Sequence, residues 1–343
     1  MKRHLNTLFV TSEGAYVGRE GEQVIVRREE QPPLRVPILQ LGAIVLFGRI
    51  GFSPSLAGLC GRHGVTLSLL STYGRFLARV EGPVSGNVLL RREQYRRADE
   101  PEHCAALAAT FIGGKLVNAR TVLRRALRER PQTTGNADIE QVAGTLGSLL
   151  KRLSNTHDLD QIRGLEGEGA RLYFSVLDHL VLSRGDTFRF SSRSRRPPLD
   201  PINALLSFAY TLLTHDVAAA LEGVGLDPAV GFLHRDRPGR FGLALDLVEE
   251  LRPIVADRLV LSLINRRQIN ERGFRREETG RVVMDEDIRK AFLVAYQERK
   301  NTAVTHPFLG ERTTIGLVPH LQARLLARHL RGDLDAYPPF IWK

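Results

Sequence analysis

The chain has 343 residues, of which 43% are hydrophobic and 25% charged, a balance typical of a soluble globular protein large enough for two domains. The 49 Lys and Arg residues exceed the 38 Asp and Glu residues and give a formal net charge of +11, which predicts a polyanionic partner, nucleic acid before membrane. Cys60 and Cys104 form neither a disulfide framework nor a metal-ligand motif. Because we also expect no signal peptide and no segment of membrane-spanning length, the sequence favours the reducing cytoplasm.

Short strands are predicted for residues 1–85. The strand segments are rich in β-branched and aliphatic residues and are bounded by glycines; they cover 7–10, 15–17, 23–26, 43–47, 65–70 and 76–80. Gly18 and Gly21 favour a tight connection between the second and third strands. Ser53 is a candidate N-cap for one helix over 55–63. We expect a small β-rich, β-sandwich-like domain without a catalytic cluster.

The composition changes at residues 86–100, where turn residues mix with arginines, and a linker is expected there. Helical periodicity then dominates 101–343, which predicts a larger all-α domain and an α+β multidomain protein. Five arginines gather late in the first of these helices, over 104–130. They exceed what a helix dipole needs, so Arg124 and Arg128 are candidate phosphate contacts.

Small residues surround two glutamates in the motif RGLEGEGARLYF. Glu166 and Glu168 precede an apolar helical face, where acids of a first turn can simply complement the helix dipole. Gly164, Gly167 and Gly169 remove side-chain bulk and would let another helix approach closely. We favour a carboxylate presented into a packed junction, and this pattern leaves open whether Glu166 or Glu168 supplies it.

A basic connector covers residues 186–203. Its arginines alternate with serines and phenylalanines, a composition typical of a nucleic-acid contact strip and also of a solvated linker. The basic and aromatic residues are Phe188, Arg189, Phe190, Arg193, Arg195 and Arg196. Asp200 followed by Pro201 predicts the start of a core helix, because aspartate favours the N-cap and proline the first helical position.

The stretch GFLHRDRPGRFGLALDLVEELRP at 231–253 combines one histidine and two carboxylates, expected to face inward, with several arginines. Its second half predicts a largely buried helix that Pro253 ends. Asp246 and Glu249 are three residues apart and share one face, where two like charges repel unless a cation or a proton lies between them. His234 comes before a turn that can fold back toward that face.

An imidazole with two carboxylates suits Mg²⁺ or Mn²⁺, whereas zinc sites more often carry cysteines or several histidines. The structural alternative is that Arg240 or Arg252 pairs the carboxylates and that His234 is a satisfied core residue. The spacing alone does not decide between a metal site and an ion-paired cluster.

Three motifs together resemble those of the CRISPR-associated integrase-endonuclease family, the catalytic subunit of the spacer-acquisition (adaptation) complex. They are GLEGEGARLYF at 164–174, RSRRPPLDPINALLSFAYTLL at 193–213 and GFLHRDRPGRFGLALDLVEELRP at 231–253. The resemblance covers nearly the whole chain and is strongest to the members found with type I-C systems. It implies a β-rich dimerisation domain, a helical catalytic domain, a homodimer, and a small ferredoxin-like adaptation partner protein.

The resemblance also implies the site residues. The family glutamate falls on Glu166 rather than Glu168, and His234 matches the motif histidine. Asp246 matches the first carboxylate of the helix, and Glu249 matches the second, where some members carry aspartate. Glu166, His234 and Asp246 are then expected to bind Mg²⁺ or Mn²⁺, and Glu249 would be a further ligand or an outer base.

The implied activity is insertion of a DNA spacer precursor into a CRISPR repeat by phosphodiester transesterification, with endonuclease activity when water attacks. Six arginines would hold the DNA backbone: Arg124, Arg128, Arg189, Arg193, Arg195 and Arg196. The alternatives are a non-catalytic nucleic-acid-binding scaffold and a metal-dependent nuclease acting on RNA or on branched DNA repair intermediates. We expect Asp246→Ala and His234→Ala to abolish Mn²⁺-dependent strand transfer and to leave the fold intact.

Overall fold

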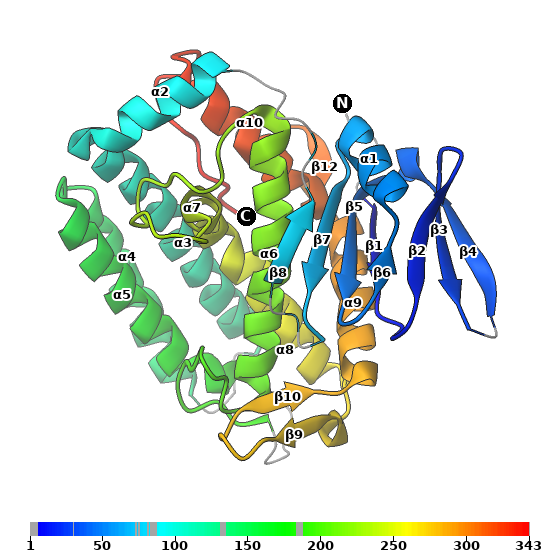
Figure 1. Cartoon of the computed structure of the whole chain (residues 1–343). Coiled ribbons are helices and arrows are strands. Elements are labelled where there is room, and N and C mark those ends of the chain that lie inside the picture. Colours follow the sequence, from blue (N-terminus) through cyan, green and yellow to red (C-terminus); the bar gives the residue numbers. More distant parts are fainter. Residues whose placement is uncertain are drawn as a thin grey trace. The chain divides into compact units, whose positions relative to one another are not determined.

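The computed structural model describes residues 6–29, 31–72, 74, 76–80, 82, 88–130, 135–182 and 188–342. Backbone contacts divide the chain into two compact units, whose elements are labelled in Figure 1. The first unit comprises residues 1–85 and 283–298, and the second comprises 86–282 and 299–343. Residues 283–298 therefore group with the N-terminal unit, whereas the sequence suggests a C-terminal domain that runs without interruption over 101–343.

In its described residues the N-terminal unit contains two four-stranded sheets, with strand orders β1-β5-β7-β8 and β4-β3-β2-β6. The strands are β1 Asn6–Val10, β2 Tyr16–Glu20, β3 Gln23–Arg28, β4 Gln31–Pro37, β5 Leu41–Phe47, β6 Gly51–Phe52, β7 Thr66–Leu70 and β8 Phe76–Val80. In the first sheet β1, β5 and β7 pair in parallel, and in the second β2, β3 and β4 pair antiparallel. Strand β4 is not predicted from the sequence because of its prolines, which an edge strand tolerates.

One hydrophobic core joins both sheets to helix α1, Pro54–His63. Val17, Ile44 and Leu56 come from the two sheets and the helix, and each is fully buried. Ser53 caps α1 as predicted, since its hydroxyl accepts a hydrogen bond from Leu56 N at 3.2 Å. Gly21, with a φ of +60°, forms the β2–β3 turn, whereas Gly18 lies within β2. The predicted β-rich N-terminal region is confirmed.

The chain after residue 85 is mostly helical, as predicted. Its α-helices are α2 Val88–Asp99, α3 Pro101–Glu129, α4 Asn136–Leu153, α5 Leu159–Ser175, α6 Pro201–Val224, α7 Gly242–Leu251, α8 Arg258–Asn265, α9 Glu286–Asn301 and α10 Val318–Leu330. The described part of this region also contains two ribbons that the all-α prediction lacks: β9 Phe274–Arg276 with β10 Val282–Met284, and β11 Ala303–Thr305 with β12 Arg312–Thr314. Short 3₁₀ helices occur among the described residues of both units: η1 Ile38–Gln40 in the N-terminal unit, and η2 Leu177–Leu180, η5 Glu271–Gly273 and η6 Ile315–Leu317 in the helical unit.

Residues 86–100, expected to be a linker, contain helix α2. Leu90 is buried, and the Gln94 side chain donates hydrogen bonds to the carbonyl oxygens of Asp227 and Val230 at 2.8 and 2.9 Å. The composition of the segment is dominated by arginines, which conceals this buried face in the sequence. Helix α2 is therefore part of the helical unit.

Helix α5 begins at Leu159, where the Asp158 carboxylate caps it by accepting a hydrogen bond from Gln161 N at 2.8 Å. Glu166 therefore lies inside the helix, and the sequence-based placement of this glutamate ahead of the helix or in its first turn is wrong.

The glycines of α5 differ in role. A Cβ on Gly169 would collide with Cδ2 of Leu116 on α3, so the predicted close helix approach occurs there, whereas Gly164 and Gly167 face open space.

Pro253 does not end the helix that begins at Gly242. After α7 the chain continues through a π-helical turn, Arg252–Asp257, directly into α8. The wider hydrogen-bonding pattern of a π turn accommodates a proline, which has no N–H to donate. The carboxylates of α7 and Asp257 are consequently parts of one continuous helical segment.

Helix α6 starts as predicted, because Asp200 accepts a hydrogen bond from Asn203 N at 2.8 Å. By length and composition α6 could cross a membrane, with a mean hydropathy of 1.4, so the expectation that no segment reaches that length is wrong. However, 61% of its most apolar window is buried. Because α6 packs against α7 and α10, we assign it as a core helix of the helical unit.

Candidate active site

Asp246 on α7 is fully buried and its carboxylate is saturated with hydrogen bonds. Its Oδ2 atom accepts from the backbone N–H groups of Phe232 and Leu233, at 2.6 and 3.0 Å. Its Oδ1 atom accepts from the backbone N–H of His234 at 3.0 Å and from the ring Nδ1 of His234 at 2.6 Å. Since a carboxylate has about four acceptor positions, this arrangement leaves Asp246 little capacity for another ligand.

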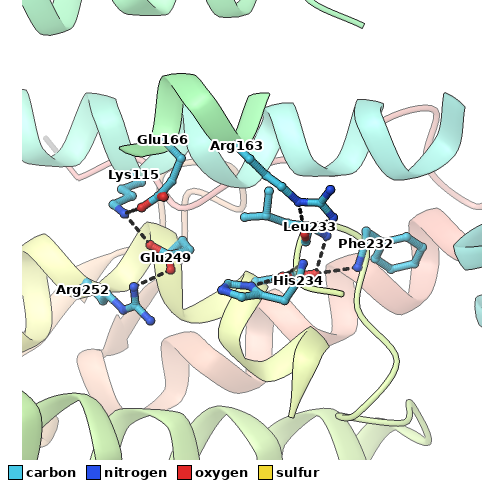
Figure 2. A network of polar contacts seen from close by, with 9 residues as sticks. Lys115, Arg163, Glu166, Phe232, Leu233, His234, Glu249 and Arg252 are labelled. Atoms are coloured by element: carbon cyan, nitrogen blue, oxygen red, sulfur yellow. Dashed lines mark hydrogen bonds and ion pairs between the residues drawn. The ribbon is translucent and has the colours of Figure 1, made fainter. Parts of the chain in front are cut away.

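The segment 231–234 is held from two sides. A Cβ on Gly231 would lie 2.7 Å from the carbonyl carbon of Gly242 and 2.9 Å from Oδ2 of Asp246, so only glycine allows this approach to α7. From the other side, the guanidinium of Arg163 on α5 donates to the Leu233 carbonyl oxygen at 2.9 and 2.7 Å (Figure 2). The position of the histidine therefore depends on both α5 and α7.

His234 presents one ring nitrogen to the site. The side chain is 19% exposed, and Nδ1 donates to the Asp246 carboxylate, which leaves Nε2 without a partner among the described residues. In Figure 2 the ring extends toward the side of the network on which Glu249 and Arg252 lie. A histidine whose Nδ1–H is held by a carboxylate offers the Nε2 lone pair in a fixed direction, as metal-binding histidines do.

A lysine joins two carboxylates from different helices. The ammonium of Lys115 on α3 forms an ion pair with Glu166 on α5 and lies 2.7 Å from Oε2 of Glu249 on α7. Arg252, one turn after Glu249, pairs with Oε1 of the same carboxylate. The Glu249 side chain is 3% exposed and the Glu166 side chain 26%, so the cluster is open to solvent at its Glu166 end.

Glu249 is held in its charged form. Burial raises the pKa of its carboxyl, but the positive charges of Arg252 and Lys115 outweigh burial and bring the pKa down to about 2. Its Oε2 atom is buried and accepts no hydrogen bond of normal geometry from the described residues, although the Lys115 ammonium is close. A buried anionic oxygen of this kind indicates a position suited to a cation.

The structure brings the four predicted ligands together as two pairs. Glu166 and Glu249 share Lys115, whereas His234 and Asp246 contact each other directly. No three His, Cys, Asp or Glu side chains in the described part of the chain converge closely enough to hold a metal ion in this arrangement. The ion-paired alternative is also realised in part, since Arg252 pairs with Glu249.

Lys115 and Arg163 are site residues that the sequence motifs do not predict. Both come from helices far from the histidine motif in the sequence, and only the packing of α3, α5 and α7 brings them to the site. A signal for Lys115 was present, because this residue is a lone charge in the apolar stretch ATFIGGKLVNA. No comparable signal distinguishes Arg163 from the many other arginines of the chain.

The candidate DNA contacts fall into two groups. Arg193 is an internal residue: its guanidinium donates to Asn203 Oδ1 at 2.7 Å and to Ser207 Oγ at 3.2 Å and lies over the Tyr210 ring, and burial lowers its pKa. The other predicted contacts are exposed; they are Arg124, Arg128, Arg189, Arg195 and Arg196. The expected interleaved aromatic strip is wrong, because the two phenylalanines of the connector are buried against Phe274 and Phe174.

A narrow recess, partly open to solvent, lies beside the ion-paired cluster. Lys115 and Arg252 line it on the side of the carboxylates, together with the exposed Arg195. Tyr210 lines another part and donates a hydrogen bond to Asp257 at 2.6 Å. The cluster therefore borders a space with positive charge on its walls.

The model of the family named CRISPR associated protein Cas1 matches residues 8–298. The chain belongs to the Cas1 family. It is 51% identical to CRISPR-associated endonuclease Cas1 1 of Chlorobaculum tepidum over 343 residues, and 52% identical to CRISPR-associated endonuclease Cas1 2 of Rhodospirillum rubrum over 347 residues. Both alignments cover 100% of each chain. The prediction of a CRISPR-associated endonuclease is confirmed, and Cas1 enzymes in general depend on a divalent metal.

Solved structures confirm the fold. A casposase bound to integration product has a TM-score of 0.85 at 24% identity, with 99% of this chain and 95% of that chain covered. A Cas1 protein from Thermotoga maritima has a TM-score of 0.80 at 23% identity, with 96% and 97% covered. The order of a β-rich region followed by a helical region is thus shared with solved structures of low sequence identity.

Proposed function

We propose that this Cas1 endonuclease inserts spacer DNA into a CRISPR array by metal-dependent phosphodiester transesterification. The observation that carries the proposal is the pair of carboxylates, Glu166 and Glu249, which share a cation beside an oriented histidine. In the integration mode a DNA 3′-hydroxyl attacks the repeat phosphodiester, the new P–O bond replaces the bond to the 3′-oxygen of the cut repeat strand, and that strand leaves with a 3′-hydroxyl. In the nuclease mode water attacks and the same P–O bond breaks. Both reactions use the same site.

The metal ligands in this proposal are Glu166, Glu249 and Nε2 of His234. Asp246 is the group that orients His234, because its own acceptor positions are already filled by N–H groups. This ranking reverses the one from sequence, which placed Asp246 ahead of Glu249. In the arrangement that Lys115 bridges, the three side chains do not converge on one point, but their donor set fits a divalent cation, since a cationic group already lies between the two carboxylates and Glu249 Oε2 is a buried acceptor without a normal hydrogen bond.

Two carboxylates and one imidazole suit Mg²⁺ or Mn²⁺, and the nitrogen ligand favours Mn²⁺. When bound, the metal supplies polarisation of the scissile phosphate and offsets the charge that develops on it. The chain's own cations add to this effect. Arg252 and Lys115 line the recess beside the carboxylates, where they can contact non-bridging phosphate oxygens, and Asp246 keeps the imidazole from rotating.

The proposed partners are DNA, as spacer precursor and CRISPR repeat, a second copy of the chain, and a small ferredoxin-like protein. One solved complex of similar fold is a Cas6-RT-Cas1–Cas2 complex, with a TM-score of 0.81, 22% identity and 36% of that chain covered. The exposed arginines of α3 and the connector would hold the DNA backbone. They are Arg124, Arg128, Arg189, Arg195 and Arg196.

The three sequence motifs support a type I-C system, and the reduced cysteines support a cytoplasmic location.

A strand-transfer assay tests the proposal. Purified protein, its small partner, a labelled spacer precursor and a plasmid with CRISPR repeats are combined with Mn²⁺, and joined products are counted. We expect joining that EDTA and Glu166→Gln both abolish. The matched control is Glu168→Gln, which alters a surface glutamate of the same helix paired with Arg152 and should retain wild-type joining.

Other outcomes separate the alternative functions. DNA binding without any metal-dependent cleavage or joining would indicate a scaffold. Cleavage of RNA or of branched DNA, without joining of the spacer precursor in the presence of the partner, would assign the same site to a different substrate. Either result contradicts the proposed integration.

A further inference from the structure

Gly114, Lys115 and Leu116 are consecutive residues of α3 and lie where α3 contacts both α5 and α7. A Cβ on Gly114 would lie 3.0 Å from the Cβ of Glu250, so α3 and α7 approach closely there. Leu116 packs against Gly169 of α5, which has no side chain, so α5 also approaches α3 closely at this point. Lys115, between these two contacts, is consequently directed at the carboxylates of both neighbouring helices.

Lys115 and a divalent cation would need the same place. The ammonium pairs with Glu166 and lies 2.7 Å from Glu249 Oε2, and these carboxylates are the proposed metal ligands. An ammonium and a metal ion within a few ångströms in a partly buried site repel strongly, so both do not occupy it together. One cation must leave when the other enters.

The surroundings favour displacement of the lysine over permanent pairing. Lysine carries a compact charge on a flexible stem, unlike the planar fork of Arg252, which stays bound to the other oxygen of Glu249. The Lys115–Glu249 contact lacks normal hydrogen-bond geometry. Lys115 also lines a narrow recess that is partly open to solvent, so its side chain borders space away from the carboxylates.

We propose that Lys115 is a resident counter-ion that neutralises Glu166 and Glu249 in the metal-free enzyme and exchanges for the divalent cation on metal binding. The inference rests on the proposed function, because it uses the same two ligands. It adds a role for a residue outside the ligand set: Lys115 stabilises the metal-free fold and lowers the metal affinity.

Mn²⁺ titration of the full chain by calorimetry tests the exchange, with Lys115→Met against wild type. Removal of the competing ammonium should tighten Mn²⁺ binding about tenfold or more. Without metal the melting temperature of Lys115→Met should fall, and Mn²⁺ should raise it by more than it raises that of wild type. Equal or weaker Mn²⁺ binding by a folded Lys115→Met protein overturns the proposal.

Lys300→Met is the matched control. Lys300 is another buried lysine, 3.0 Å from Asp216, in the same unit but outside the cluster. Its removal should lower the melting temperature and leave the Mn²⁺ affinity at the wild-type value. A tenfold tightening in this control as well would show a general effect of lost charge and would overturn a specific exchange at Lys115.

Amine labelling of the wild-type enzyme provides a second test that does not depend on the folding of a variant. The Lys115 side chain is only 11% exposed and is ion-paired, so an acylating reagent should modify it slowly without metal. Saturating Mn²⁺ should accelerate modification of Lys115, as quantified by peptide mass spectrometry. Unchanged or slower labelling overturns the exchange.

The two proposals fail in different ways. If Mn²⁺ binds wild type and Glu166→Gln with equal affinity, or binds neither protein, the proposed metal site is wrong. The counter-ion role of Lys115 is then wrong as well. If Mn²⁺ binding depends on Glu166 but not on Lys115, the metal site stands and only the exchange is wrong.

Discussion

Oδ1 of Asp246 and Nδ1 of His234 lie 2.6 Å apart, and the same carboxylate also accepts three backbone N–H groups of the segment that carries the histidine. The most deeply buried carboxylate of the site therefore supports the imidazole and shapes the chain around it. This double role separates Asp246 from Glu166 and Glu249, whose partners are all cations.

Substitution of Asp246 should damage folding as well as activity, contrary to the expectation from sequence. Asp246→Ala leaves three backbone N–H groups without an acceptor, those of Phe232 and Leu233 buried and that of His234 partly buried, which should cost about 3–5 kcal/mol of unfolding free energy. His234→Ala removes a partly exposed ring and should lose strand transfer with a change of about 1 kcal/mol or less. Urea denaturation of both variants distinguishes these effects, and equal stability of the two would contradict the support role.

Two glycines of α5 offer a matched pair of substitutions. Gly167→Ala faces open space in a helix interior and should stabilise the protein by about 0.5–1 kcal/mol. Gly169→Ala drives a methyl group into Leu116, with Leu149 and Leu146 close behind, so it should be less stable than Gly167→Ala by about 1–3 kcal/mol. Thermal denaturation measures both, and similar melting temperatures would argue against close packing of α3 on α5.

Arginines of the connector should respond differently to truncation. Arg195→Ala and Arg196→Ala remove exposed cations, so each should weaken DNA binding and reduce the salt-dependence slope by about 1, with little loss of stability. Arg193→Ala removes contacts to Asn203 and Ser207 and should destabilise the fold. Filter binding over a salt series, with melting curves, checks the contrast. An unchanged salt slope for both exposed variants would exclude them as phosphate contacts.

Because of Asp257, the unfolding free energy of the protein should decrease as the pH rises. Burial raises the pKa of its carboxyl from 3.8 to about 6, against the opposing hydrogen bond from Tyr210. The folded state therefore holds a proton that the unfolded state has released, and this contribution, present below about pH 4, is lost as the pH rises through about 6. The difference in unfolding free energy between wild type and Asp257→Asn should decrease by on the order of 2–3 kcal/mol across that range.

The measurement for Asp257 is urea denaturation of both proteins at several pH values between 4 and 7. The substitution keeps the size of the side chain and removes its titration, so the other ionisable groups cancel in the difference. A difference that stays constant over this range would show that Asp257 is already charged at low pH in the folded protein.

Local signals in the sequence were sufficient for most elements and for part of the site. Ser53 and Asp200 are caps whose side chains act on their own helices, and both were predicted correctly. The start of α5 was missed at Asp158, and the π turn at Pro253 has no signature in a pattern of apolar residues. Edge strand β4 was hidden by its prolines.

The chemistry of the site depended on contacts between distant segments. Spacing placed Asp246 and Glu249 on one helix face, and the family resemblance selected Glu166. Neither indicates which carboxylate would be surrounded by N–H donors and which by cations, because that depends on how α3, α5 and the 231–234 segment pack on α7. Lys115 belongs to the site solely through such packing.

Diffraction from Mn²⁺-soaked crystals would locate the metal and show which side chains bind it. We predict one anomalous peak within coordination distance of Glu166, Glu249 and Nε2 of His234, with Asp246 still bound to Nδ1. The Lys115 ammonium should have left the carboxylates. A peak coordinated by Asp246, or a fully soaked crystal in which Lys115 still bridges Glu166 and Glu249, would contradict it.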